Sequence, residues 1–363
     1  MIRASSLVSA ASTALLALLC GCGSSSNSFT SNGTVPASVS AASGYKVSVF
    51  ATSSEAGKST NPDSIVQLGS NVFVGFGDAV NPDGTVPNSD PPVQGQTEVI
   101  EYDMTGKVVK TFEVIGHNDG LLTYDSQTIW AMSNEDANPT LTVINVSTGA
   151  ETQYTPTTPL LHGGGLDDMQ LIQGAVYASA SNPTVSAPIS GFPNGVVTGA
   201  PAVISIALNA NGKTFDWSPV LSGSAQATDM VSGTTVTLNM TDPDSESIDP
   251  NGNLVVDSQQ DSELVYLQNI GTANQTAKVL LLNLYGNPWP VDDTRFVPTG
   301  NNPYLLFTDT PSNTIYRVDG TFKATDAYSA GQGTILKMDP ATGNLAPVII
   351  GLNAPHGMLF VTQ

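Results

Sequence analysis

Residues 242–261 read DPDSESIDPNGNLVVDSQQD, in which two short strand-forming runs flank a turn of Asp, Pro, Asn and Gly. Short runs of β-branched and aromatic residues bounded by turn residues are typical of strands. No stretch after residue 44 repeats apolar residues at helical spacing over a dozen positions. Strand-forming runs of the same kind occur elsewhere, as NVFVGF at 71–76, TIWAM at 128–132 and AVYA at 175–178. The sequence therefore predicts an all-β fold: a sandwich, a barrel or a propeller.

A longer unit built around such runs recurs along the chain. Each copy starts with a segment that carries Asp and continues into a strand, a turn and a stronger strand, followed by further strand-forming runs. The copies start with NPDS at 61, HNDG at 117, LDDM at 166, DPDS at 242 and VDDT at 291. Four strands per unit, repeated every 50 to 75 residues or so, are typical of propeller blades. The repeat predicts a β-propeller of four-stranded blades; five or six blades both fit, and we favour six.

The two ends of the domain indicate how the ring of blades closes. The chain ends in APHGMLFVTQ (354–363), which has the pattern of the first strand of another blade but lacks the outer strands. YKVSVFA at 45–51 is an isolated strand-forming run. We expect this N-terminal strand to pair with the C-terminal strand, because closure removes the exposed sheet edges that favour aggregation.

The first 22 residues, MIRASSLVSAASTALLALLCGC, place one Arg before an apolar stretch that ends in small residues. This layout is typical of a secretory leader, and its end resembles the bacterial lipobox, with Leu19 three residues before Cys22. We predict a lipoprotein signal peptide at 1–21 and lipidation at Cys22; an ordinary leader cleaved near Gly21 is the alternative. In the lipoprotein Cys20 leaves with the leader, so no disulfide is expected.

The segment after the leader is rich in Ser, Gly, Asn, Thr and Ala and poor in large apolar side chains. This composition predicts a flexible tether over 22–44, followed by the propeller domain at 45–363. By resemblance to Gram-negative lipoproteins, Gly23 favours the outer membrane over the inner membrane. We expect a protein of the cell envelope, periplasmic or on the cell surface, that touches the membrane through its lipid alone.

The chain has 31 acidic and 11 basic residues, which gives a formal net charge of -20. A surface of this charge repels nucleic acid and anionic lipid headgroups and attracts cations. Binding of nucleic acid is therefore not expected. We expect a monomer that meets a small ligand or a protein partner.

Alignment of the unit starts puts one polar residue at the same place in each: Asp63, Asp119, Asp168, Asp244, Asp293 and His356. If these residues begin the innermost strands, their side chains meet at the mouth of the central channel. The three histidines of the chain lie at or near the same places: His117, His162 and His356. Such a ring suits Ca²⁺ if oxygen ligands dominate and a transition metal if two histidines take part. In the alternative, each Asp accepts backbone N–H bonds from a neighbouring blade and ties the propeller together.

Two segments resemble a known superfamily. IDPNGNLVVD at 248–257 is similar to the Asp-x-x-Gly-Asn-Leu-x-Val hairpin of the six-bladed propellers of the NHL-repeat and gluconolactonase-like (TolB-like) superfamily, and Pro355-His356-Gly357 adds to the resemblance. HNDG at 117–120 is similar to the segment that supplies a metal-ligand Asn in gluconolactonases, which implies Asn118 as a ligand. The early Glu ligand and the Pro-Asn-Gly ligand segment of that family have no match at the expected places. The resemblance therefore bears on the fold more than on the activity.

Two functions of different kinds follow. The first is a non-enzymatic propeller that binds a small ligand or a protein at the channel mouth, around a divalent cation. The alternative is a metal-dependent, lactonase-like hydrolase or lyase in which His117 or His356 moves a proton. The Pro-His-Gly tripeptide is also similar to streptogramin-lyase-like propellers, which use a His as general base. A serine triad is not indicated, because no Gly-x-Ser-x-Gly occurs.

Overall fold

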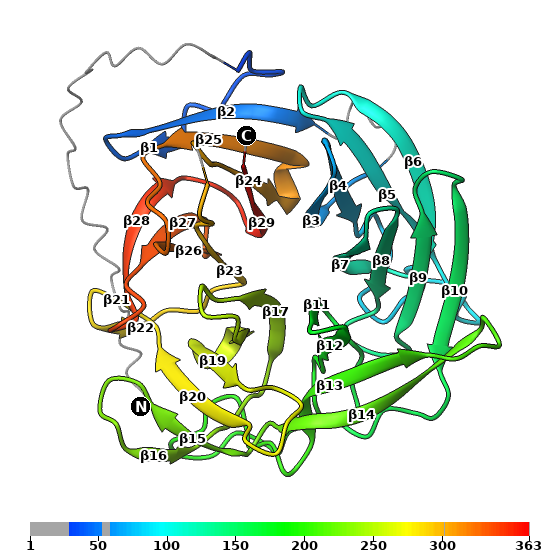
Figure 1. Ribbon diagram of the computed structural model, residues 1–363, viewed down its shortest axis with the longest axis vertical. Coiled ribbons are helices and arrows are strands. Elements are labelled where there is room, and N and C mark those ends of the chain that lie inside the picture. The colour runs from blue at the N-terminus through cyan, green and yellow to red at the C-terminus, as the bar shows by residue number, and fades with distance from the viewer. Residues whose placement is uncertain (1–28, 53–58, 301, 363) are drawn as a thin grey trace, which may run out of the picture.

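The computed structural model describes residues 29–52, 59–300 and 302–362 of the chain. This part consists of strands and loops with two single-turn 3-10 helices, η1 (Gln259–Asp261) and η2 (Thr310–Ser312). Its sheets stand around a common axis (Figure 1), so the predicted all-β propeller is confirmed. Within these ranges no helix is long and apolar enough to cross a membrane. Cys22 and the predicted signal peptide lie outside the described residues.

Four blades follow sequence order from the axis outwards, and each is named here by its innermost strand. The β3 blade contains β3 (Pro62–Leu68), β4 (Asn71–Phe76), β5 (Gln96–Asp103) and β6 (Val108–Ile115). The β7 blade contains β7 (Asn118–Asp125), β8 (Thr128–Ser133), β9 (Thr140–Asn145) and β10 (Ala150–Pro156). The β11 blade contains β11 (Met169–Ile172), β12 (Ala175–Ser179), β13 (Pro201–Leu208) and β14 (Thr214–Ser222). The β17 blade contains β17 (Pro243–Ile248), β18 (Leu254–Ser258), β19 (Glu263–Gln268) and β20 (Thr276–Leu281).

Short parallel pairings join or extend some blades at their outer edges. β10 pairs with β14, so the β7 and β11 blades form one continuous sheet. The β17 blade is extended through β20 by the hairpin of β15 (Gln226–Asp229) and β16 (Thr235–Thr237). These connections cover outer edges that would otherwise expose unpaired backbone groups.

The β23 and β29 blades exchange strands. The β23 blade consists of β23 (Asp293–Phe296), β26 (Ala327–Gly331), β27 (Thr334–Met338) and β28 (Asn344–Ile350). Its outer edge carries β1 (Ser40–Ala41), β21 (Asn283–Leu284) and β22 (Asn287–Pro288). The β29 blade consists of β29 (Pro355–Val361), β24 (Tyr304–Asp309), β25 (Thr314–Gly320) and β2 (Tyr45–Thr52).

This exchange corrects the sequence prediction for the last unit. The segment that starts with VDDT at 291 was expected to build one blade from consecutive strands. Instead β23 pairs with β26, whereas β24 and β25 lie in the next blade between β29 and β2. The N-terminal strand β2 and the C-terminal strand β29 do belong to one blade, as predicted, but β2 is its outermost strand and β29 its innermost, so they do not pair directly.

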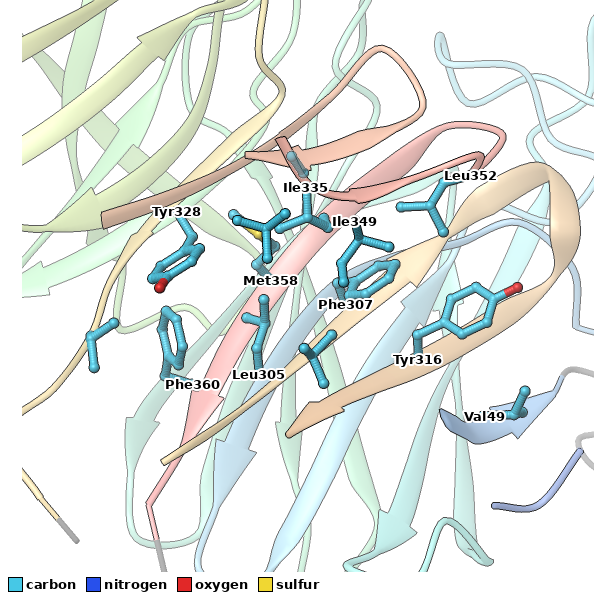
Figure 2. Close-up of a cluster of buried hydrophobic side chains, with 14 residues drawn as sticks. Val49, Leu305, Phe307, Tyr316, Tyr328, Ile335, Ile349, Leu352, Met358 and Phe360 are labelled. Carbon is cyan, nitrogen blue, oxygen red and sulfur yellow. The ribbon is translucent and has the colours of Figure 1, made fainter. Parts of the chain in front are cut away.

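A hydrophobic cluster fills the interface between the β23 and β29 blades (Figure 2). Phe307 and Tyr316 stack with ring centroids 5.2 Å apart, and Tyr328 meets Phe360 edge to face at 5.7 Å. Ile335 and Met358 are almost fully buried in the same cluster. Burial of this apolar surface stabilises the interleaved arrangement and connects the first and last strands of the domain.

The segment before β2 is part of the propeller. Phe29 stacks on Phe50 at 5.9 Å between ring centroids, and the Asn32 side chain donates hydrogen bonds of 2.6 Å to the main-chain oxygens of Phe50 and Thr105. Val35 and Val39 pack against the cluster of Figure 2. The predicted flexible tether therefore does not hold for residues 29–44, because a few well-spaced apolar side chains and backbone pairing compensate for a polar composition.

Candidate functional site at the channel mouth

The first strand of each blade brings one polar side chain to a shared cavity of about 280 Å³. These side chains come from equivalent positions at the mouth end of β3, β7, β11, β17, β23 and β29: Asp63, Asp119, Asp167, Asp244, Asp292 and His356. Four of them, Asp63, Asp119, Asp244 and His356, are residues singled out in the sequence. The structure thus gathers residues that are up to 293 positions apart in the chain (from Asp63 to His356).

Asp168 and Asp293, the other two predicted ring residues, lie outside this cavity, and Asp167 and Asp292 take their places. Oδ2 of Asp168 accepts a hydrogen bond of 3.1 Å from Glu246 N, and Oδ2 of Asp293 accepts one of 2.7 Å from Met358 N. Both donors belong to the next blade, so these two residues perform the blade-tying role considered as the alternative. Neighbouring residues on an extended chain point in opposite directions, so a one-residue misalignment exchanges the two roles.

The tie between blades follows a regular spacing. Ser64 makes the same contact from the β3 blade, because its Oγ accepts a hydrogen bond of 2.9 Å from Leu121 N. In all three ties the donor lies two residues after the cavity residue of the next blade. The ties therefore fix the height of Asp119, Asp244 and His356 along the channel axis.

Glycine occupies the position after the cavity residue at two places where neighbouring blades come close together. A Cβ on Gly120 would lie 2.3 Å from the main-chain oxygen of Asp167, and one on Gly357 would lie 2.4 Å from that of Asp63. Real side chains do not tolerate such distances. Gly120 and Gly357 therefore allow the next inner strand to come close enough for its cavity carboxylate to reach the mouth.

A second set of residues lines the cavity from the loops above the inner strands, and the sequence prediction missed it. It includes Glu135 and Asp136 after β8, Ser181 and Asn182 after β12, Gln259 and Gln260 in η1, and Asp242 before β17. The sequence does contain a signal for these residues, because each of them follows or precedes a strand at the end of the blade that carries the cavity residue. Eight of the 14 lining residues are therefore Asp or Glu.

Crowding and burial raise the pKa of several of these carboxyl groups. Burial, followed by repulsion from neighbouring acids, raises the pKa of Glu135 to about 8 and holds the pKa values of Asp119 and Asp244 well above the usual range. Burial, followed by repulsion from Glu135, also raises the pKa of Asp167 well above its usual range. Because the pKa of Glu135 is about 8, the cavity without a bound cation retains protons at neutral pH.

His356 is the basic residue among those that line the cavity. Its Nδ1 lies 3.1 Å from Oδ2 of Asp292 and 3.5 Å from Oδ1 of Asp63. Burial alone would lower the pKa of the imidazole, but the carboxylates of Asp292 and Asp63 raise it to about 10. At neutral pH His356 is therefore positively charged and can donate a proton but not accept one.

His117 lies beside the cavity and faces two of its carboxylates. Its Nδ1 is 2.7 Å from the main-chain oxygen of Val80, and its Nε2 is 3.5 Å from Oδ1 of Asp119. One potential ligand atom from each of Asp63, His117 and Asp119 lies within 4.8 Å of the others. Among the described residues this is the group of three that could hold a metal ion.

His162 and Asn118 do not join the site. His162 is buried, and its Nε2 lies 2.7 Å from the main-chain oxygen of Gly165, so it stabilises the Gly-rich turn before β11. Asn118 is fully buried, and its Nδ2 donates a hydrogen bond of 2.7 Å to Met132 O. The implied metal-ligand role of Asn118 is not supported by this position, because its Oδ1 lies against Gly75 of the neighbouring β3 blade and the side chain does not line the cavity.

Below the cavity, Arg295 occupies the space between the inner strands. Its Nε donates a hydrogen bond of 3.0 Å to Met358 O, and its guanidinium pairs with Asp293 at 2.8 Å and with Asp168 at 3.4 Å. The cation thus balances the two blade-tying carboxylates. It does not line the mouth cavity and leaves the acids there without a permanent positive partner other than His356.

Comparisons with solved structures recover propellers. A proposed gluconolactonase has 12% sequence identity and a TM-score of 0.46, covering 86% of this chain and 82% of that one. A streptogramin B lyase has 13% identity and a TM-score of 0.43, covering 88% of each chain. A virginiamycin B lyase from Staphylococcus aureus has 12% identity and a TM-score of 0.33, covering 76% of this chain and 99% of that one. Similarity this low transfers neither an activity nor the role of any residue.

No protein-family model matches the chain, and no curated protein matches it in sequence.

Proposed function

We propose that this protein is an exported, lipid-anchored β-propeller of the cell envelope that binds a divalent cation at its channel mouth, together with a small ligand or a protein partner. The observation that carries the proposal is the mouth cavity itself, in which eight acidic residues face a single basic residue, His356. Like charges at this density repel one another unless protons or a cation neutralise them. The cavity is also the point at which every inner strand contributes a side chain.

Six blades are part of the proposal, as is membership of the NHL-repeat and gluconolactonase-like superfamily. The blade count is supported by the strands β3, β7, β11, β17, β23 and β29, each of which begins a row of four paired strands. The superfamily is supported by residues 248–257, which form the hairpin between β17 and β18. In that turn Oδ1 of Asp249 accepts hydrogen bonds from the main-chain nitrogens of Asn251 and Asn253.

Export and lipidation are supported by the leader and the lipobox-like end at Cys22. Replacement of Cys22 by Ser should move the protein from the membrane fraction to the soluble fraction. Mass spectrometry of the mature N-terminal peptide should find acylated Cys22 in the wild type. An unmodified N-terminus at or near Cys22 would show that the leader is an ordinary one.

Cation binding can be tested on the full chain after treatment with a chelator. A cation that binds the folded state alone stabilises it by about 2.7 kcal/mol at 100 times its Kd. We expect Ca²⁺, Mg²⁺, Mn²⁺, Co²⁺ or Zn²⁺ to raise the unfolding temperature of the wild type. The increase should be lost in Asp119→Asn. It should be retained in the control Asp125→Asn, which alters an exposed residue at the end of the same strand. If none of these ions binds or stabilises the wild type, the proposal is wrong.

A second candidate function, a metal-dependent hydrolase or lyase, is favoured by one specific observation. The group of Asp63, His117 and Asp119 supplies three ligands and faces an open cavity, so a bound ion would keep positions for water or substrate. Such an ion would polarise a carbonyl group or acidify its bound water. His356, charged and 3.5 Å from Asp63, is placed to protonate a leaving group.

This candidate predicts turnover of lactones or related esters by the metal-loaded protein. Asp119→Ala should abolish both cation binding and turnover, whereas His356→Ala should lower turnover by about 100-fold, as for loss of a general acid, and leave the cation bound. If the protein binds the cation but turns over none of a broad panel of lactones, the enzymatic candidate is wrong and the binding function stands.

A further inference from the structure

We infer that the cation of the mouth cavity is a first-row transition metal ion held by Asp63, His117 and Asp119, with the imidazole Nε2 of His117 as the ligand that selects it. The inference rests on the proposed function, because it specifies the chemistry of the cation-binding site. It differs from the ligand set implied by the gluconolactonase resemblance, in which Asn118 would bind the ion.

The first step of the argument is the tautomer of His117. A carbonyl oxygen can only accept, so the contact of 2.7 Å between Nδ1 and Val80 O requires the proton on Nδ1. The lone pair of the neutral ring is then on Nε2, the atom that faces Asp119. Histidines that bind metals in proteins donate their other ring N–H in this way, commonly to a backbone carbonyl.

The second step is the distance between the facing atoms. Nε2 of His117 and Oδ1 of Asp119 are 3.5 Å apart, which is too far for a good hydrogen bond. Two ligands placed about 2.1 Å from one metal ion at a tetrahedral angle are separated by about 3.4 Å. The spacing therefore fits ligands of a common ion better than partners in a direct hydrogen bond.

The third step is that the ring and the carboxylate are both held in place. A Cβ on Gly77 would lie 2.3 Å from Cε1 of His117, so the ring packs directly on the backbone at Gly77. The main chain of His117 exchanges hydrogen bonds with Asn134, through its N–H at 2.9 Å and its carbonyl at 2.9 Å. The Asp119 side chain is 3% exposed, and its Oδ2 accepts a hydrogen bond of 3.2 Å from Glu135 N, which leaves Oδ1 facing the cavity.

The ligand types decide between the possible cations. Two carboxylates balance the charge of a divalent ion, and an imidazole nitrogen suits Zn²⁺, Co²⁺ or Ni²⁺ far better than Ca²⁺ or Mg²⁺, which prefer oxygen. Ca²⁺ would instead draw on other carboxylates of the same cavity. The contribution of His117 therefore distinguishes a transition metal site from an all-oxygen site.

The experiment uses the full chain, stripped with a chelator, and titrates it by calorimetry with Zn²⁺, Co²⁺, Ca²⁺ and Mg²⁺. The visible absorption of bound Co²⁺ reports an imidazole ligand directly. We expect Zn²⁺ and Co²⁺ to bind with one ion per chain, and His117→Gln to weaken both by about 100-fold or more and to change the Co²⁺ spectrum. His356→Gln alters the other histidine at the cavity and shows whether His117 or His356 supplies the imidazole that Co²⁺ reports. The matched control Asp125→Asn, at the exposed end of β7, should leave Zn²⁺ affinity within about fivefold.

The outcomes separate the inference from the proposed function. If Ca²⁺ or Mg²⁺ binds tightly while Zn²⁺ and Co²⁺ binding is unaffected by His117→Gln, the inference is wrong and the proposed cation site stands. If His356→Gln, rather than His117→Gln, changes the Co²⁺ spectrum, the ligand assignment is wrong. If no ion binds the folded wild type, both fail. Circular dichroism of each variant confirms that a loss of binding is not a loss of folding.

Discussion

Arg295 makes contacts with several inner strands in the interior of the channel. Its guanidinium lies among the inner strands β17, β23 and β29, where it pairs with Asp168 and Asp293 and donates to the main-chain oxygens of Glu246 and Met358. Removing one partner of a buried ion pair leaves an uncompensated charge in a medium that solvates it poorly. This single side chain thus connects four blades, the β11, β17, β23 and β29 blades.

We expect Arg295→Met to lower the free energy of unfolding by about 3 to 5 kcal/mol. Urea denaturation followed by circular dichroism measures the change. Lys337→Met is the matched control, because Lys337 pairs with Asp326 at the surface, and loss of such a pair costs less than about 1 kcal/mol. Equal losses in the two variants would contradict the central role of Arg295.

Asp167 and Asp168 are adjacent in sequence and perform opposite tasks, which makes them a second test. Asp168→Asn should lower the free energy of unfolding by about 1 to 3 kcal/mol, because the side chain ties the β11 blade to Glu246 N and pairs with Arg295. Asp167→Asn should change it by less than about 1 kcal/mol at pH 8, because it relieves repulsion in the cavity. Chemical denaturation of both variants decides, and a larger loss in Asp167→Asn would reverse the assignment.

The residue scale is also where sequence reasoning came close and then failed. The position of one polar residue at each unit start was predictable because the repeat aligns the units. The choice between Asp167 and Asp168, or between Asp292 and Asp293, was not, because both members of each pair are acidic and the deciding fact is the direction in which the side chain points. That direction depends on the tie to the next blade, which lies 78 residues away for Asp168.

At the scale of strands, the exchange between the β23 and β29 blades also depends on contacts between residues far apart in the sequence. The sequence contains the strand-forming runs of β23, β24 and β25 in order, and order alone suggests neighbours. Their partners are set by side-chain packing in the cluster of Figure 2, to which β2, β24, β26 and β29 all contribute. Pairings between distant segments leave no local pattern in the sequence, so this part of the fold could not be predicted from it.

The segment that precedes β2 provides the prediction at this scale. A variant that starts at Tyr45 loses the contacts of Phe29, Asn32, Val35 and Val39 with the propeller. At about 1 kcal/mol for each partly buried apolar side chain, its free energy of unfolding should fall by about 3 kcal/mol relative to a variant that starts at Phe29. Denaturation midpoints and resistance to protease provide the measurement. Identical midpoints would mean that residues 29–44 are a tether after all.

At the scale of the whole molecule, the mouth cavity should make stability depend on pH. The folded-state pKa of Glu135 is raised to about 8 and that of His356 to about 10, both above their usual values. In each case the folded state holds a proton that the unfolded state has released, so stability is fully present below the unfolded pKa and is lost as pH rises through the folded pKa.

We therefore expect the chelated protein to become less stable between about pH 5 and pH 9, by about 1.4 kcal/mol per pH unit for each excess proton held by the folded state. Glu135→Gln should make this decline shallower between pH 5 and pH 8, because the amide does not titrate. A saturating divalent cation should also flatten it by replacing the protons. Thermal unfolding across the pH series tests this, and a chelated protein that gains stability towards pH 9 would contradict it.

The packing of residues 29–44 against the propeller limits how far the propeller can lie from the membrane. If Cys22 carries a lipid, six residues separate it from Phe29, where packing against the propeller begins. The seven backbone steps from Cys22 to Phe29 span about 25 Å at full extension. A linker this short keeps the propeller close to the bilayer. The protein would then bind only those ligands that reach the membrane surface.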